Sequence, residues 1–454
     1  MNRSQSNKIS DIIFKRFILN SILTIFVLSS LNYYYEINAI QETPVKDSMK
    51  NSLFEQLVEK NDKRIINYPG SNITNLTNNN EDSIYGQIEA FENNVYVVWQ
   101  ESVTKSFPKH NYDIFFIKSE DRGKTFSDPI NLSNNPGFSE HPQIAVSQNG
   151  VFVVWADNTG YENNKEIMFT KSIDNGKTFS DPINLSNNSK VSFKQEISTF
   201  DKNIYVVWQD TPQDSINGKN SSIIFRSSNN IGDTFNDSIE LINNTTIDSF
   251  PKVNSFKNYV YVVWNDENKK NSGMFFVRST DNGLNFDDII KLNNDNSFGE
   301  SQIAVNQNEV LVIWGGFLAK KIDTIYYVMS IDNGKTFTEP KLITEKIIFN
   351  DKNEQNELNK IVKYPMNVEL AIKNNLSYVV WQNTFSQQNE DIILSVFPKN
   401  EQDNLYTKIL NLSNNTGISE CPSIAISDNN IYIIWEDYTP GNHEILYTRI
   451  PIIY

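Results

Sequence analysis

An eight-residue segment recurs along the chain and constrains the fold more than any other feature of the sequence. The letters SIDNGKTF stand at residues 172–179 and again at residues 330–337. Three looser copies, SEDRGKTF, SNNIGDTF and STDNGLNF, begin at Ser119, Ser228 and Ser279. The five copies begin 51 to 56 residues apart. Such a regular period indicates a repeat architecture in which each repeat is one supersecondary unit.

The tryptophans mark the same repeat more completely than the hairpin segment does. Each Trp ends an apolar run such as VYVVW or IYIIW, which is typical of a strand buried on both faces. These residues are Trp99, Trp155, Trp208, Trp264, Trp314, Trp381 and Trp435. A first strand precedes each run, a third follows it, and the hairpin leads to a fourth. Seven units of four antiparallel strands predict an all-β, seven-bladed β-propeller, with blades that begin near Ser83, Ser139, Lys190, Asp248, Phe298, Lys363 and Glu420.

The two ends of the repeat array are expected to complete each other. The seventh unit ends after its third strand, near Ile450, and no fourth strand follows. Residues 71–79 (SNITNLTNN) resemble fourth strands such as PINLSNNPG. The N-terminal strand therefore pairs into the last blade in this prediction, which closes the ring and leaves no unpaired edge. A charged insertion, residues 344–362, is expected between blades five and six.

The hairpin segment has a structural logic of its own. Asp-x-Gly between two strands is hairpin chemistry, because the carboxylate can bond nearby backbone amides and Gly accepts a positive φ. We therefore assign structural roles to Asp121, Gly123, Asp174, Gly176, Asp281, Gly283, Asp332 and Gly334. The pattern Ser-x-Asp-x-Gly-x-Thr-Phe resembles the Asp box (BNR repeat) of sialidases and related β-propellers. The resemblance covers roughly residues 70–454 and implies the fold first, because Asp boxes occur in propellers of many functions.

The same resemblance can be tested against the catalytic residues of sialidases. It would imply three arginines that hold a substrate carboxylate, a Tyr nucleophile paired with Glu, and an Asp acid/base. A planar guanidinium suits that carboxylate because it donates two parallel hydrogen bonds. The predicted propeller contains only Arg122, Arg226, Arg278 and Arg449, in or near the hairpins and never on a first strand. The resemblance therefore covers the scaffold and fails at the catalytic arginines, and we assign no catalytic residue.

The N-terminal segment has the features of an export signal. Lys15 and Arg16 precede the uncharged run 17–31, and Ala39 precedes a tolerable cleavage site. An uncleaved anchor that includes Tyr33–Tyr35 is the alternative. Residues 1–39 are thus a signal peptide or anchor, residues 40–69 a polar linker with a short helix at 48–59, and residues 70–454 the propeller. We expect a secreted or cell-surface protein that meets the membrane only through an uncleaved N-terminal segment.

Charge and cysteine content exclude several classes of protein. The formal net charge of −15 argues against a nucleic-acid partner. A single Cys excludes both a disulfide framework within the chain and a Cys-based zinc site.

The loops opposite the hairpins carry acidic residues in register with the repeat. We group eight of them as a candidate acidic ring: Glu101, Asp157, Asp210, Asp266 and Asp437, each two residues after a Trp, and Glu140, Glu300 and Glu420, at the entrances of first strands. Three interpretations stay open. The carboxylates cap their own loops, they form an acidic funnel for Ca²⁺ or a cationic or polyhydroxyl ligand, or two of them act as a glycosidase pair about 6.5–9.5 Å apart.

Other polar and aromatic residues on this face are interpreted more modestly. The three histidines, His110, His141 and His443, are expected to be solvated loop residues, and Cys421 a buried filler. Phe317 and Tyr438 are positioned to stack on a sugar, although ordinary packing is favoured.

Together these features predict an exported propeller that binds a surface carbohydrate or an envelope protein without catalysing a reaction. Two other functions stay open: a glycoside hydrolase of sialidase-like fold, and a purely structural surface protein. No cofactor is assigned with certainty, and Ca²⁺ is the cation that the acidic ring would suit.

Overall fold

The computed structural model divides the chain into two compact units, Met1–Asn67 and Tyr68–Tyr454. The structure describes residues of the second unit alone: 73–103, 111–158, 164–215, 220–245, 249–266, 272–293, 299–318, 321–343, 365–373, 376–386, 389–398, 408–415, 417–439 and 441–452. The expected signal, linker, helix at 48–59 and insertion at 344–362 all lie outside these residues. In the described part of the chain, no helix has the length and apolar character needed to cross a membrane.

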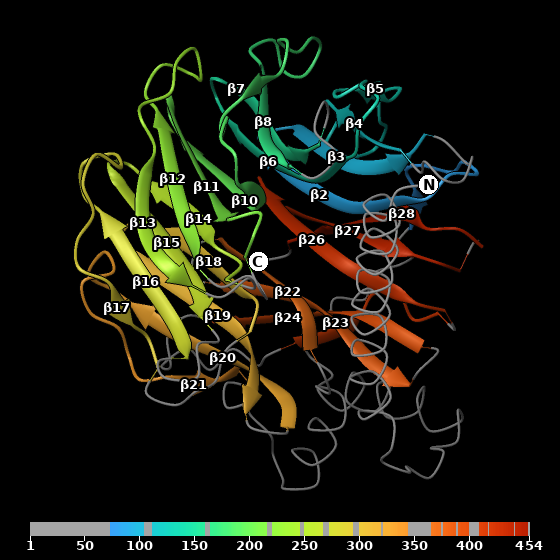
Figure 1. Cartoon of the computed structure of the whole chain (residues 1–454). Helices are drawn as coiled ribbons and strands as arrows, with labels where there is room; N and C mark the ends of the chain where they lie inside the picture. Colours follow the sequence, from blue (N-terminus) through green and yellow to red (C-terminus); the bar gives the residue numbers. More distant parts are fainter. Residues whose placement is uncertain are drawn as a thin grey trace, which may run out of the picture. The chain divides into compact units, whose positions relative to one another are not determined.

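The described residues form seven four-stranded antiparallel sheets, which confirms the predicted seven-bladed β-propeller (Figure 1). Blade one contains β2 (Ser83–Phe91), β3 (Asn94–Ser102), β4 (Tyr112–Ser119) and β5 (Ile130–Asn131); blade two β6 (Ser139–Ser147), β7 (Gly150–Asp157), β8 (Glu166–Ser172) and β9 (Ile183–Asn184); blade three β10 (Val191–Phe200), β11 (Asn203–Thr211), β12 (Ser221–Ser228) and β13 (Ile239–Thr245). Blade four contains β14 (Lys252–Phe256), β15 (Tyr259–Asp266), β16 (Gly273–Ser279) and β17 (Ile290–Lys291); blade five β18 (Ser301–Asn306), β19 (Glu309–Leu318), β20 (Lys321–Ser330) and β21 (Lys341–Leu342). Blade six contains β22 (Pro365–Lys373), β23 (Leu376–Ser386), β24 (Asn389–Pro398) and β25 (Lys408–Asn411); blade seven β26 (Ser419–Ser427), β27 (Asn430–Asp437), β28 (Glu444–Pro451) and β1 (Thr74–Asn75).

The first strands of the blades form the inner ring of the propeller. Each contacts the first strands of its two neighbours, from β2 through β6, β10, β14, β18 and β22 to β26, and β26 contacts β2. Figure 1 accordingly shows the blue strands of blade one beside the red strands of blade seven. Side chains of seven different strands therefore meet at the centre of the ring.

The N-terminal strand closes the ring as predicted. β1 pairs antiparallel with β28, with Thr74 opposite Tyr447 and Asn75 opposite Leu446. The Leu76 N–H donates to the Ile445 carbonyl at 2.9 Å, and Leu76 packs on the core shared by blades one and seven. The last blade is thus made of strands from both ends of the described chain.

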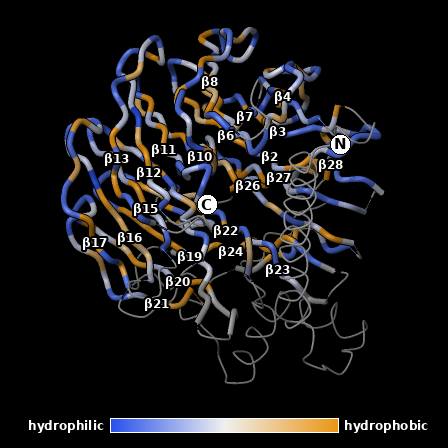
Figure 2. Tube along the Cα trace, viewed as in Figure 1, coloured by the Kyte–Doolittle hydropathy of each residue, from blue (hydrophilic) through white to orange (hydrophobic). Residues whose placement is uncertain are grey.

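The second strand of each blade holds the core. All seven Trp side chains are less than 2% exposed, and the residues before them are nearly all buried. The clusters run between blades: Phe116 of β4 packs with Val153 and Trp155 of β7. Figure 2 shows this as hydrophobic colour along the strands and hydrophilic colour in the connections. Because truncating such a Trp costs about 3–5 kcal/mol, these residues fix how the blades stack.

The repeat hairpins, residues 119–126, 172–179, 228–235, 279–286 and 330–337, fasten each blade to the preceding one. In the second copy, Asp174 Oδ1 accepts the Thr178 N–H at 2.9 Å and Oδ2 accepts the Thr178 hydroxyl at 2.7 Å. Gly176 has a φ of 75°, and a Cβ there would lie 2.6 Å from Phe116. Phe179 packs edge-on against Phe116, with ring centroids 4.8 Å apart. The hairpin therefore needs Gly both for its turn and for its close approach to the neighbouring blade.

Candidate functional site

Five residues of the candidate acidic ring follow a Trp by two positions, and four of these organise the same hydrogen-bond network. In blade two, Asp157 Oδ2 accepts from Trp155 Nε1 at 3.1 Å, from Ser139 Oγ at 2.8 Å and from Asn135 Nδ2 at 2.7 Å. Ser139 begins the first strand, and Asn135 lies in the loop before it. The equivalent donors surround Glu101, Asp210 and Asp437.

Burial gives these carboxylates a structural role. Asp157, Asp210, Asp266 and Asp437 are at most 8% exposed. A carboxylate that accepts three hydrogen bonds inside a blade ties the indole of the second strand to the first strand and to the incoming loop. Blades five and six carry Gly316 and Asn383 at this position. Within the described residues Trp314 Nε1 and Trp381 Nε1 have no hydrogen-bond partner, and neither does Trp264 Nε1 of blade four, although Asp266 follows it by two residues. The network is thus a device of the repeat, and ligand binding by these carboxylates stays a prediction.

The other three acidic residues lie nearer the centre of the ring, at the starts of first strands. Glu140 forms an ion pair with Lys165, and Glu300 is exposed. Glu420 Oε1 lies 3.9 Å from His443 Nδ1, and partial burial raises the pKa of the Glu420 carboxyl. The candidate acidic ring is therefore two separate groups: the acidic residues that follow a Trp, and the three glutamates at the starts of first strands.

A β-bulge recurs at one position of the first strand in five blades. The register shifts after Ile84, Glu140, Phe193, Met366 and Glu420. At the equivalent bulge position in six blades a non-glycine residue has a positive φ between 35° and 56°. We call these six residues the bulge ring: Tyr85, His141, Lys194, Phe250, Asn367 and Cys421. Left-handed backbone at bulky side chains is a strained conformation that is concentrated at functional sites, and bulges re-aim side chains there.

Members of the bulge ring contact one another from blade to blade. The rings of Tyr85 and His141 have centroids 4.2 Å apart. Lys194 Nζ lies 3.4 Å from the centroid of the Phe250 ring. Asn367 Nδ2 lies 3.4 Å from Cys421 Sγ. Tyr85 and His141 are exposed, while the other four are partly exposed. The bulge ring thus presents three contacting pairs of side chains, which offer aromatic, cationic and amide groups to solvent.

A charged layer lies next to the bulge ring, two residues further along the first strands. Lys252 Nζ lies 2.8 Å from Glu196 Oε2, and Gln302 Nε2 donates to Glu369 Oε1 at 2.5 Å. Burial at the centre of the ring raises the pKa of Glu369 to about 7, and that of nearby Glu89 to about 8. The carboxylates of Glu196 and Glu369 contribute to the shift at Glu89, so charges on separate blades interact across the centre.

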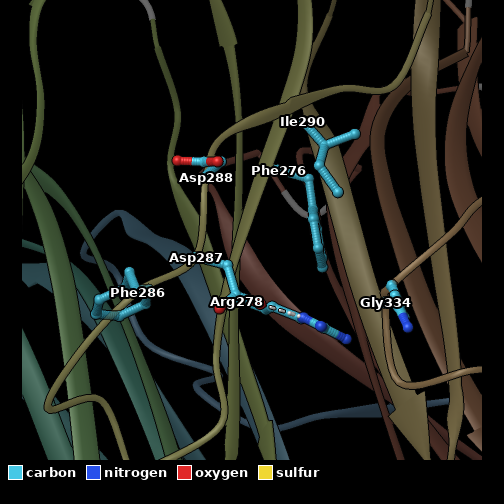
Figure 3. A pocket seen from close by; sticks show the side chains of 8 residues that line it. Phe276, Arg278, Phe286, Asp287, Asp288, Ile290 and Gly334 are labelled. Atoms are coloured by element: carbon cyan, nitrogen blue, oxygen red, sulfur yellow. Dashed lines mark hydrogen bonds and ion pairs between the residues drawn. The ribbon is translucent and has the colours of Figure 1, made fainter.

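The hairpin side of the propeller carries a pocket of about 470 Å³ (Figure 3). It lies where the hairpin of blade five meets blade four, and Phe276, Arg278, Phe286 and Gly334 contribute to its lining. Arg278 Nε donates to Asp287 Oδ2 at 2.6 Å, and its Nη1 donates to the Asn333 carbonyl at 2.8 Å. Because this guanidinium already has a carboxylate and a carbonyl as partners, the pocket is poorly suited to hold an anionic substrate.

The other three arginines of the propeller are engaged in the same way. Arg226 and Arg449 donate to the backbone carbonyls of Leu185 and Arg122, and Arg122 Nε donates to Asn93 Oδ1. As the sequence predicted, these guanidinium groups lie at the hairpins rather than on the first strands.

Several residues have a different environment from the one that the sequence suggested. His141 belongs to the bulge ring, and Cys421, which the sequence predicted to be a buried filler, is only half-buried. Tyr438 is 48% exposed, with its ring 5.0 Å from that of His443. His110 and the side chain of Phe317 lie outside the described residues.

Sequence reasoning missed the bulge ring, the central charged layer and Glu436. A signal was present for Glu436: the residue after Trp is Gln100, Gln209 and Gln382 in three blades, but a carboxylic acid in blade seven. The bulges had no comparable signal, because the residues that adopt the positive φ share no side-chain type.

Comparison with known proteins adds to the fold and leaves the function open. No known protein family matches the sequence, and no curated protein matches it. Among solved structures, a protein of unknown function from Dyadobacter fermentans is similar at a TM-score of 0.52 and 13% identity, over 84% of this chain and 99% of that one.

The similar structures also include sialidases. The Trypanosoma rangeli sialidase has a TM-score of 0.46 and 10% identity, over 82% of this chain and 55% of its own length. The intramolecular trans-sialidase of Ruminococcus gnavus has a TM-score of 0.46 and 13% identity, over 82% and 94% of the two chains. At TM-scores below 0.5 these sialidases carry no inference about this chain, and the Dyadobacter fermentans structure, at 13% identity, bears on the fold alone.

Proposed function

We propose that this protein is an exported Asp-box propeller that binds a carbohydrate at the bulge ring without catalysing a reaction on it. Much of the repeat recurs from blade to blade: the Trp in all seven blades, a Ser bonded to the acidic residue two positions after that Trp in blades one, two, three and seven, and the hairpin in blades one to five. The bulge position keeps its unusual backbone but carries six different residue types. A position at which the scaffold preserves geometry and varies chemistry is suited to recognition, and this observation supports the proposal most strongly.

The chemistry of the bulge ring favours a sugar over other ligands. Exposed Tyr85 and His141 offer flat faces against which the apolar side of a sugar ring can pack. Asn367, Lys194 and the nearby Glu140 and Glu300 offer donors and acceptors for hydroxyl groups. Mixed flat and hydrogen-bonding groups at one place are typical of small-ligand sites.

Binding to immobilised glycans is the direct test. The wild-type propeller should bind a subset of glycans, and Tyr85→Ala and His141→Ala should each weaken binding about ten-fold, the effect of losing one ring contact. Asp174→Ala, on the hairpin side, is the matched control and should retain wild-type affinity. If Asp174→Ala lost binding as strongly as Tyr85→Ala did, the site would have to be moved to the hairpin side.

The same experiment separates the rival functions. Release of sugar from the bound glycans would favour a glycoside hydrolase over a binding protein. Absence of binding to every glycan, with capture of one defined envelope protein instead, would overturn the carbohydrate proposal.

Export is tested separately. N-terminal sequencing of the protein recovered from culture medium should give a mature chain that begins at Ile40. A chain that begins at Met1 in the membrane fraction would indicate a retained anchor, and intact protein in the cytosol would contradict export.

A further inference from the structure

Blade seven brings two carboxylates and an imidazole together beside the bulge ring. Glu420 lies near the start of β26, Glu436 near the end of β27, and His443 directly before β28. One potential ligand atom from each of the three lies within 4.8 Å of the others. Glu436 is 3% exposed, while Glu420 and His443 are each about 31% exposed at the side chain. The group is therefore anchored in the blade and reachable from solvent.

Comparison with the other blades shows that the scaffold does not require a carboxylate at position 436. Glu436 Oε1 accepts the backbone N–H of Tyr85 in the next blade at 2.5 Å. In blade one the same bond is made by a neutral amide, because Gln100 Oε1 accepts the His141 N–H at 3.0 Å. Gln382 Oε1 likewise accepts the Cys421 N–H at 3.4 Å. Glu436 thus introduces a carboxyl group at a position where the amide of Gln would accept the same backbone hydrogen bond.

The neighbouring charges make this substitution costly unless a cation is bound. Glu436 and Glu420 are direct cross-strand partners, a placement that destabilises like charges. In blade two the equivalent of Glu420 is Glu140, which pairs with Lys165 and has Ala156 opposite. Blade seven replaces that lysine by His443 and that alanine by Glu436, so two carboxylates share one imidazole. His443 Nδ1 is buried and, among the described residues, has no hydrogen-bond partner.

We propose that Glu420, Glu436 and His443 form a binding site for a divalent first-row transition metal such as Zn²⁺. Carboxylate oxygens and a neutral imidazole nitrogen are a common ligand set for Zn²⁺, and the imidazole disfavours Ca²⁺, which takes oxygen ligands. Three protein ligands leave a coordination position for water or for a ligand group on the solvent side.

The inference does not rest on the carbohydrate proposal, because the metal can be titrated alone. Metal-stripped full-length protein should bind a single Zn²⁺ in calorimetric titration and melt several degrees higher with Zn²⁺ present. Ca²⁺ at the same concentration should have little effect. With Co²⁺ in place of Zn²⁺, visible absorption should report a low-coordinate site that contains a nitrogen ligand.

Single substitutions distinguish the site from adventitious binding. Glu436→Gln preserves the acceptor for the Tyr85 N–H and should fold normally, yet it should weaken Zn²⁺ binding at least about ten-fold. His443→Asn should have a similar effect and abolish the Co²⁺ absorption. Glu140→Gln, the equivalent change in blade two, is the matched control and should leave Zn²⁺ affinity unchanged.

Two outcomes would overturn the proposal. One is Zn²⁺ affinity that is the same in wild type, Glu436→Gln and Glu140→Gln, because the metal would then bind elsewhere. The other is a wild-type melting temperature that does not change with Zn²⁺, together with a higher melting temperature for Glu436→Gln. That result would show that Glu420 and Glu436 repel each other and bind no metal.

Discussion

The hairpin side and the bulge side of this propeller use the same repeat in opposite ways. At the hairpins, blades two and five carry identical eight-residue segments, and even the copy with Asn230 in place of Asp keeps the Ser228 and Thr234 hydrogen bonds. At the bulge ring the backbone is repeated while the side chains change from blade to blade. Identity of sequence marks the scaffold, and variation on a repeated backbone marks the place where specificity can arise.

The largest loss of stability is expected when β1, the strand that closes the ring, is removed. Deleting residues 73–79 removes β1, the Leu76 side chain from the core and the bonds to β28. Loss of one partly buried Leu side chain and several backbone hydrogen bonds should reduce the free energy of unfolding by about 3 kcal/mol. Thermal unfolding of the deletion variant should show a melting temperature lower by many degrees. An unchanged melting curve would refute closure by β1.

The buried network below the bulge ring should be the next most sensitive. Asp157→Ala leaves the Trp155, Ser139 and Asn135 donors without their acceptor. We expect a loss of about 3 kcal/mol in urea unfolding, the cost of unsatisfied buried donors after a charged acceptor is removed. A variant as stable as wild type would show that Asp157 is available for ligands, and would restore the acidic-ring interpretation.

The central charged layer should give the propeller a stability that falls as pH rises. The folded-state pKa of Glu89 is about 8, above its ordinary value of 4.5, so stability is full below about pH 4.5 and is lost as pH rises toward 8. Glu196, Glu369 and Lys252 are the charged groups that share this layer. Urea unfolding at pH 8 should therefore show Glu89→Gln to be more stable than wild type by about 2 kcal/mol. At pH 4.5 the two proteins should be equally stable. If they were equally stable at pH 8 as well, Glu89 would have to be well solvated.

The hairpins should show the opposite pH dependence and the smallest effect. Hydrogen bonds from Thr178 and Ser172 hold the pKa of Asp174 below its ordinary value of 3.8. Its contribution is present above about pH 4 and is lost as pH falls further. Asp174→Ala should lower the melting temperature slightly at pH 7 and by less at pH 2. A difference as large at pH 2 as at pH 7 would mean that the carboxylate charge is not the stabilising element.

The sequence was sufficient for the scaffold and insufficient for the site, for a physical reason. Trp155 and Asp174 repeat because each blade must stack and each hairpin must turn, so their pattern predicts blade number, strand order and ring closure. Tyr85 and Cys421 share neither size nor polarity, and what they have in common is a positive φ that follows from pairing across β3 and β27. The buried state of Asp157 was likewise invisible, because it depends on Ser139 and Asn135 of the same blade. Glu436 was within reach, because it departs from the Gln found in three other blades.

The closure by β1 also imposes an order in time. The Ile445 N–H donates to Thr77 Oγ1 at 3.1 Å across 368 residues of chain. A ribosome makes β1 before any other described strand and β28 after all of them, so the first strand must wait unpaired while six blades are synthesised. Contacts between such distant residues form late and slowly. The propeller consequently completes its last blade only after synthesis is nearly finished.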